Sequence, residues 1–188
     1  MQRCVRSAVV VASLLLAAAA DAARQVWFVP WKVLEPGVEA KPSLLAVYWI
    51  PASSEELRRS DLLTSRALTT YSGRCVAMHV VRIDDTARLQ RFSSATLPIV
   101  VLADGDRELA RLPSGQATVR ASDVEAMVRT EFDARAAAAE AALDEARALL
   151  ERGDQVAAVA LYQSVAQQRC AFPREAKAAR RALRKLGR

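Results

Sequence analysis

The side chains in this sequence that could do chemistry are few: two thiols and one imidazole. Cys75 and Cys170 remain once Cys4, in the N-terminal segment, is set aside, and His79 is the only histidine. A lone histidine within an apolar run is more typical of a hydrogen-bonded strand residue than of a ligand or a base, and no cysteine or carboxylate cluster has the spacing of a zinc site. We therefore expect no metal and no cofactor.

Two readings of the cysteines stay open. Cys75 opens the apolar run Cys75–Ile83, which predicts a buried strand, and buried cysteines are usually inert. A thiol enzyme that uses Cys75, with Cys170 as its resolving partner, is the alternative. The two residues lie far apart in the sequence, so their spacing alone does not decide whether they pair.

A strand followed at once by a helix is the most informative local pattern. The apolar run Leu44–Ile50 has the length of a buried strand, and Pro51 stops it. Ser53 and the acids after it indicate a helix start, because hydroxyls cap a first turn and carboxylates favour its positive end. One helix is expected to follow, with leucines facing a core: Leu57, Leu62, Leu63 and Leu68.

A second pattern combines a proline, a strand and a hairpin. Pro98 directly precedes the apolar run Ile99–Leu102, where a proline cannot occupy a central ladder position. Asp104-Gly105 then predicts a hairpin turn into a strand over Arg107–Leu112. A short polar helix near Thr86–Phe92 is expected between this unit and the preceding strand.

These features together resemble the thioredoxin-like family over roughly Ser43–Phe132. The resemblance rests on the strand with Tyr48-Trp49, the turn after it, Thr96-Leu97-Pro98 and the hairpin. It implies an α/β fold, with a thioredoxin-like mixed sheet flanked by helices. It also implies that Leu97–Pro98 is cis and lies within side-chain reach of the Pro51–Ser54 turn.

The chain departs from that family where thiol chemistry would occur. Ser53 and Glu56 stand where redox-active members have their two cysteines, and Val47 stands where those members have a buried acid. A serine cannot form the mixed disulfide that thiol exchange requires. Ser53 is not a convincing hydrolase nucleophile either, because His79 belongs to another strand and no triad pattern surrounds it.

The first 23 residues are predicted to be a signal peptide. Arg3 and Arg6 form a basic region, Ala8–Ala20 is an apolar run too short to span a membrane comfortably, and the small residues around Ala22 fit a cleavage site. An uncleaved anchor is the less favoured alternative. We expect an exported protein, most simply in a bacterial periplasm.

Residues 24–42 mix prolines with aromatic residues. Val26–Val29 predicts an edge strand, because Pro30 is tolerated at a sheet edge. Trp27, Phe28 and Trp31 are expected to pack over the sheet, and an exposed aromatic patch is the alternative.

A long helix is predicted from Asp123 to Arg152, where no glycine or proline interrupts the chain. The pattern over Ser122–Glu125 predicts a capping box at the helix start, and Gly153 predicts the helix end. The helices that follow resemble a tetratricopeptide-like hairpin plus one more helix. A plain three-helix appendage explains the same pattern equally well.

The net charge of +6 is confined to the C-terminus. The last fifteen residues hold seven basic side chains and one acid, so the rest of the chain is close to neutral. The charge therefore gives no reason to expect nucleic-acid binding. Contact of this basic helix with anionic lipid is a weak alternative to a solvated face, because its apolar side chains are small.

These observations predict three segments: a signal peptide over 1–23, a thioredoxin-like domain over 24–132, and a helical extension over 133–188. The predicted function is a non-catalytic, exported binding or assembly module, of which a chaperone-like holdase is a variant. Its partner would be a protein or peptide in a groove lined by Trp49, Pro51, Ser53, Leu97 and Pro98. The alternative is a thiol-disulfide oxidoreductase or redox-responsive protein using Cys75 and Cys170.

Overall fold

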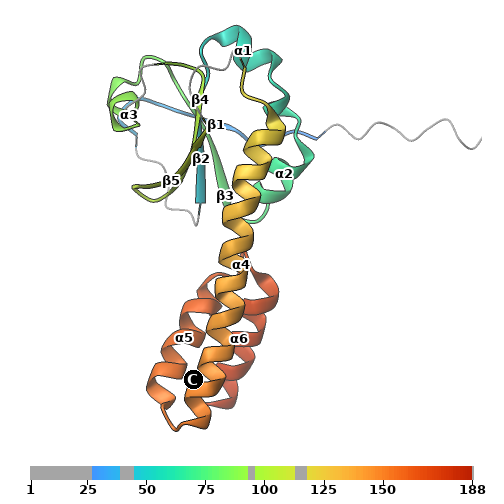
Figure 1. Ribbon diagram of the computed structural model, residues 1–188, viewed down its shortest axis with the longest axis vertical. Coiled ribbons are helices and arrows are strands. Elements are labelled where there is room, and N and C mark those ends of the chain that lie inside the picture. The colour runs from blue at the N-terminus through green and yellow to red at the C-terminus, as the bar shows by residue number, and fades with distance from the viewer. Residues whose placement is uncertain (1–26, 39–44, 93–95, 113–117, 188) are drawn as a thin grey trace, which may run out of the picture.

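A mixed five-stranded sheet forms the first part of the molecule. The computed structural model describes residues 27–38, 45–92, 96–112 and 118–187. The strand order is β1-β3-β2-β4-β5; β1, β3 and β2 are parallel, whereas β4 runs antiparallel to β2 and β5 (Figure 1). The predicted mixed α/β sheet is thereby confirmed. Its strands are β1 (Lys32–Leu34), β2 (Leu45–Ile50), β3 (Val76–Val81), β4 (Ile99–Asp104) and β5 (Arg107–Leu112).

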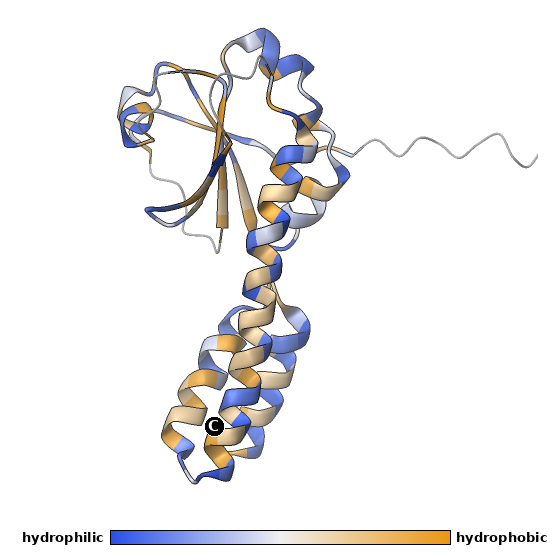
Figure 2. Cartoon of the chain, viewed as in Figure 1, coloured by the Kyte–Doolittle hydropathy of each residue, from blue (hydrophilic) through white to orange (hydrophobic). Residues whose placement is uncertain are grey.

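Helices cover both faces of this sheet. Side chains of β2 alternate between the faces, so that Trp49 packs in the core under α2 (Arg66–Ser72) and α4 (Ala121–Glu151), while Tyr48 faces α3 (Thr86–Arg91). Every residue of β2 is buried, as expected for a central strand with both faces covered. Figure 2 shows the central strands as mostly hydrophobic.

The single helix predicted after Pro51 is wrong, because the chain breaks it into three pieces. These are α1 (Ser54–Arg59), the short 3-10 helix η1 (Asp61–Leu63) and α2. Ser60 and Ser65 each accept a hydrogen bond from a backbone N–H two or three residues on, and so begin a new helical segment. The prediction that leucines of this segment face the core is confirmed for Leu62 and Leu68, which are fully buried.

Helix α4 is continuous, as predicted, but its start is not the predicted capping box. The helix begins at Ala121, whose N–H donates to both carboxylate oxygens of Asp61 at 3.1 Å. Glu125 accepts a hydrogen bond from Ser65 at 2.6 Å instead of reaching back to its own helix start. A carboxylate from η1 thus does the capping that the sequence pattern assigned to Ser122.

The N-terminal edge strand lies later than predicted. β1 covers Lys32–Leu34, not Val26–Val29; Val26 lies outside the described residues. Trp31 packs as expected: its Nε1 donates to the Leu62 carbonyl at 3.0 Å, and its ring meets Trp49 edge-on at 5.5 Å. Phe28 does not pack, because 71% of its surface is exposed.

The second half of α4 joins α5 (Gln155–Gln167) and α6 (Pro173–Lys185) in a three-helix unit, which we call the helical extension (Figure 1). Gly153 ends α4 with a φ of 84°, as the sequence predicted, and the chain turns back into α5. Small side chains on all three helices let them approach closely. No helix in the described ranges is long and apolar enough to cross a membrane; the predicted signal segment 1–23 lies outside them.

A disulfide ties the helical extension to the sheet part. Cys75, at the start of β3, is bonded to Cys170, between α5 and α6, with their Cα atoms 5.8 Å apart. The two residues are 95 positions apart in the sequence. The bond therefore closes a loop of about half the chain, which restricts the unfolded ensemble strongly.

Aromatic packing supports the same joint. The guanidinium of Arg74 donates to the Ala171 carbonyl at 2.9 and 3.1 Å and lies 4.3 Å above the ring centroid of Phe132. Phe132, on α4, packs against Phe172 with ring centroids 5.0 Å apart. Both rings are almost completely buried, so the extension is held by its own core as well as by the disulfide.

Replacing Asp61 by alanine should lower the free energy of unfolding by about 1 kcal/mol, because α4 would lose the side-chain cap that Asp61 provides at Ala121. Urea denaturation measures this change. Asp106→Ala is the matched control, since that carboxylate is fully exposed and should have almost no effect. Equal losses in the two variants would contradict the capping role.

Removing the disulfide with Cys75→Ser/Cys170→Ser should lower the free energy of unfolding by about 2 to 4 kcal/mol, because the unfolded chain regains the entropy of a long loop. Adding reductant should destabilise the native protein similarly and leave the double variant unchanged. A double variant as stable as the native protein would mean that the bond contributes nothing to the joint.

Candidate functional site

The strand-to-helix turn and the proline before β4 meet at one edge of the sheet. In the antiparallel pairing of β2 with β4, Ile50 lies opposite Ile99. Pro51 and Pro98, the next residues outward on the two strands, therefore lie side by side at the same edge. The Leu97–Pro98 peptide bond is cis, which confirms the predicted isomer.

Two side chains of the turn, Ser53 and Glu56, accept backbone hydrogen bonds near the start of α1. Ser53 is the N-cap of α1, and its Oγ accepts from the Glu56 N–H at 3.1 Å. Glu56 reaches back, and its Oε2 accepts from the Ala52 N–H at 2.7 Å. This arrangement resembles a capping box, except that Glu56 reaches the N–H of Ala52, one residue before the N-cap, so both side chains accept backbone hydrogen bonds at the helix start.

The five residues predicted to line a groove differ in exposure. Trp49 is fully buried and lies in the core against Trp31, while Pro51 and Pro98 are buried at the sheet edge. Leu97 is half-buried and Ser53 is exposed. A ligand at this edge would thus reach Ser53 and Leu97 first, with Trp49 supporting the turn from beneath.

A hollow of about 500 Å³ opens beside the turn. One wall comes from Ala52, Ser53 and α1, and the other from Thr118, Val119 and Arg120, which precede α4. No local pattern predicts the second wall, because these three residues precede α4 in a loop and reach the turn only through the fold. Of the five residues predicted to line a groove, Ser53 alone lines this hollow, so the hollow lies beside the predicted groove and does not coincide with it.

Cys75 differs from the prediction in two ways. It precedes the strand rather than opening it, and it is exposed rather than buried. Its φ of 63° places it in the left-handed region, where the chain turns from α2 into β3. Cys170 is also exposed. The two candidate thiols form one disulfide at the surface, away from the turn that carries Ser53.

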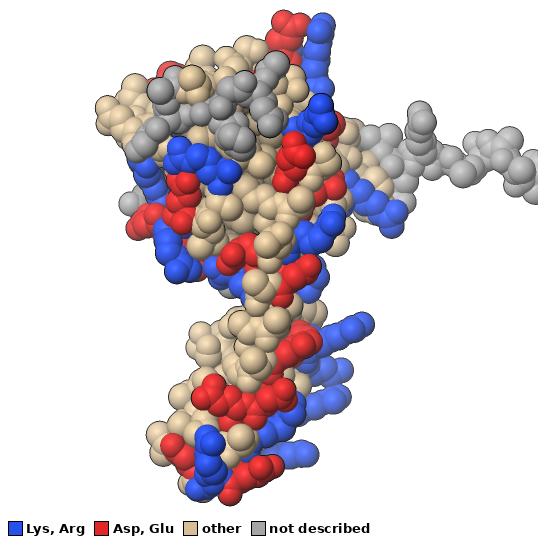
Figure 3. All heavy atoms as spheres, viewed as in Figure 1, with Lys and Arg blue, Asp and Glu red and all other residues tan. Residues whose placement is uncertain are grey.

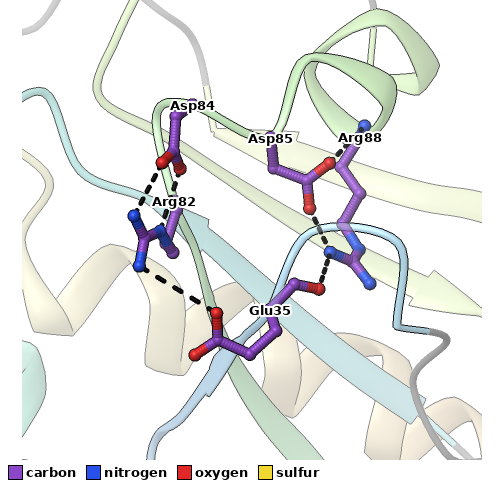
Figure 4. Close-up of polar contacts among 5 residues, drawn as sticks. All are labelled: Glu35, Arg82, Asp84, Asp85 and Arg88. Carbon is purple, nitrogen blue, oxygen red and sulfur yellow. Dashed lines mark hydrogen bonds and ion pairs between the residues drawn. The ribbon is translucent and has the colours of Figure 1, made fainter.

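Charged residues gather at the edge where the parallel strands β1 and β3 end. Figure 4 shows Arg82 between Asp84 and Glu35, and Arg88 between Asp85 and the carbonyl of Glu35. The bidentate hydrogen bonds from Arg82 lower the pKa of Asp84. Each charged group in this cluster is paired, so the cluster stabilises the strand ends and leaves no group poised for catalysis.

His79 lies in β3, as predicted, but the expected hydrogen bond is missing. Neither ring nitrogen has a partner among the described residues, and the ring stacks on Tyr48 at 5.3 Å. Burial lowers the pKa of His79, and the charges of Lys32 and Arg88 lower it further. Within the described ranges, no group of His, Cys, Asp and Glu side chains could hold a metal ion.

No protein-family model matches this sequence, and no curated protein matches it. The fold as observed, a mixed five-stranded sheet with helices on both faces, is compatible with a thioredoxin-like fold. The function has to be inferred from the residues at the turn and from the surfaces around them.

The pH dependence of stability should report on His79. Its folded pKa lies below the unfolded value of about 6.5, so the unfolded state binds the proton more readily. The contribution of neutral His79 to the free energy of unfolding is therefore fully present above about pH 6.5. It is lost as the pH falls from there toward the folded-state pKa. Urea denaturation between about pH 7.5 and 5.5 should show a steeper loss for the native protein than for His79→Phe. Equal slopes would contradict the prediction, because the chain has no other histidine.

Proposed function

We propose that this chain is an exported, redox-inactive protein of the thioredoxin-like type that binds an extended segment of another protein beside its strand-to-helix turn. The observation that carries the proposal is that Ser53 and Glu56 each accept a backbone hydrogen bond at the start of α1, at the edge that also holds cis-Pro98. Side chains that cap the helix start take the place of a thiol pair. What remains is a binding surface without redox chemistry.

Support for the thioredoxin-like assignment comes from the combination of features at one edge. The sheet has a strand-to-helix turn after β2, a cis-proline at the start of the neighbouring β4, and a hairpin into β5. The helical extension is proposed to be tetratricopeptide-like, since α5 folds back on α4 and α6 follows. Export is supported by the N-terminal sequence pattern and is compatible with the disulfide.

The binding mode follows from what is accessible at this edge. Pro51 and Pro98 lie side by side where β2 and β4 meet, with Leu97 half-buried and Ser53 exposed beside them, so an extended peptide can lie across this edge. Ser53 and Thr118 line the adjoining hollow and offer polar contacts. None of these contacts requires a thiol, so binding can persist in a chain without the catalytic cysteines.

Site-specific photo-cross-linking tests the proposal. A photoreactive residue at Ser53, in the mature full-length chain incubated with the native envelope fraction, should give a discrete adduct. The same adduct should form from Thr118, because both positions line one hollow. Val156 on α5 is the matched control, since it is highly exposed and lies in the helical extension. No adduct at Ser53, or the same adduct from Val156, would refute binding at the turn.

Thiol exchange at Cys75 and Cys170 is the second candidate, because both residues of the disulfide are exposed. A substrate thiolate would attack one sulfur, form a mixed disulfide and release the other sulfur as a thiolate. In the Cys170→Ser variant the free Cys75 thiolate should attack a substrate disulfide, release one substrate thiolate and keep the other half as a mixed disulfide, because no resolving thiol remains. Reductant-sensitive adducts that depend on Cys75 would favour this candidate; their absence favours binding alone.

A further inference from the structure

Helix α6 presents an unpaired basic face. Glu175 is the only acid in this helix, and no ion pair or hydrogen bond joins any of its basic side chains to another described residue. Figure 3 shows a row of Lys and Arg side chains on the side of the helical extension where α6 lies. Its basic residues, all exposed, are Arg174, Lys177, Arg180, Arg181, Arg184 and Lys185.

A groove of about 480 Å³ runs beside this face, between α4 and α6. Apolar side chains from three helices form its floor, and cations form its rim. Arg147 on the α4 side is paired with Asp144 at 2.6 Å, whereas Arg181 and Lys185 on the α6 side have no such partner. The floor includes Leu150, Tyr162 and Leu186.

We propose that this groove binds an acidic segment of a partner protein that also carries apolar side chains. Charge complementarity favours acidic residues in the partner segment, because the unpaired cations Arg181 and Lys185 flank the groove. The remaining cations of α6 extend the positive field along about 20 Å of helix. The leucines of the floor argue for apolar side chains between those acids, since burying them stabilises the complex without further charge.

The shape of the surface disfavours a lipid bilayer as its occupant. The small apolar residues Ala176 and Ala179 of α6 are completely buried against the neighbouring helices, so they are not available for insertion. The leucines of the groove lie on a concave floor, which a flat bilayer would not reach. A protein segment can enter the groove and contact floor and rim together.

Nucleic acid is disfavoured for a separate reason. Single-stranded nucleic acid is held by aromatic side chains on which bases stack, together with a basic track. Tyr162 is the aromatic residue that contributes to this groove, and only 3% of its surface is exposed. The groove therefore offers leucines and cations, which suit an acidic peptide better than a base.

Fluorescence anisotropy with synthetic peptides tests this proposal on the mature full-length chain. The probe is a labelled amphipathic peptide of about twelve residues built from Leu and Glu, long enough to follow the groove. A Leu/Lys peptide and a Ser/Glu peptide of the same length are the comparisons. We expect the Leu/Glu probe to bind, the Leu/Lys probe not to bind, and the Ser/Glu probe to bind at least about tenfold more weakly.

Two charge-reversal variants separate the groove from the general charge of the helix. Arg181→Glu/Lys185→Glu changes the rim, and Lys177→Glu/Arg180→Glu makes the same change in net charge outside the groove. The rim variant should bind the Leu/Glu probe at least about tenfold more weakly than the native protein, and the control variant less than about threefold more weakly. Circular dichroism should show both variants folded, since all four side chains are exposed.

Several results would overturn the proposal. They are equal losses in the two variants, equal binding of the Ser/Glu and Leu/Glu probes, and no binding of the Leu/Glu probe at about 1 mM. Two further results would overturn the proposal by showing that something other than a partner segment occupies the groove. Co-sedimentation with phosphatidylglycerol vesicles, without peptide binding, would identify a lipid surface. A dimer that only the rim variant dissociates would identify a second copy of this chain.

Discussion

The pairing of β2 with β4 is the constraint on which the candidate site depends. Because Ile50 lies opposite Ile99, the turn after β2 and the cis-proline before β4 emerge at one edge of the sheet. A shift of one residue would turn the side chains of β2 over, moving Trp49 out of the core under α2 and α4. The placement of Trp49 in one core and of Tyr48 in the other therefore fixes both the register of β2 and the position of the turn.

Helix α4 connects the sheet to the helical extension. Its first half packs on the sheet through Val124 and Val128, and its second half forms the core of the helical extension. Phe132 lies between the two halves, where it meets Phe172 and the guanidinium of Arg74. The turn and the groove between α4 and α6 consequently belong to one continuous scaffold, on which we place two separate binding surfaces.

Much of the fold followed from local patterns, whereas the contacts between distant residues did not. The strands over 45–50, 76–81 and 99–104 and the end of α4 at Gly153 each have a signal within a few residues. The prediction of a cis bond at Pro98 rests on the resemblance to thioredoxin-like proteins, because the local sequence also permits a trans bond. The cap that Asp61 provides to α4, and the pairing of Cys75 with Cys170, join segments that only the fold brings together. At the turn, the sequence shows that residues 53 and 56 are not cysteines, but not that both side chains accept backbone hydrogen bonds.

The central claim is our proposal that the chain binds a partner without redox turnover, because Ser53 and Glu56 accept backbone hydrogen bonds at a turn where redox-active thioredoxin-like proteins have cysteines. The most direct measurement is the rate at which the mature protein accelerates the reduction of a protein disulfide by dithiothreitol. We predict no acceleration beyond that of Cys75→Ser/Cys170→Ser, because neither turn residue can form a mixed disulfide. Catalytic turnover by the native protein that Cys75→Ser abolishes would contradict the claim.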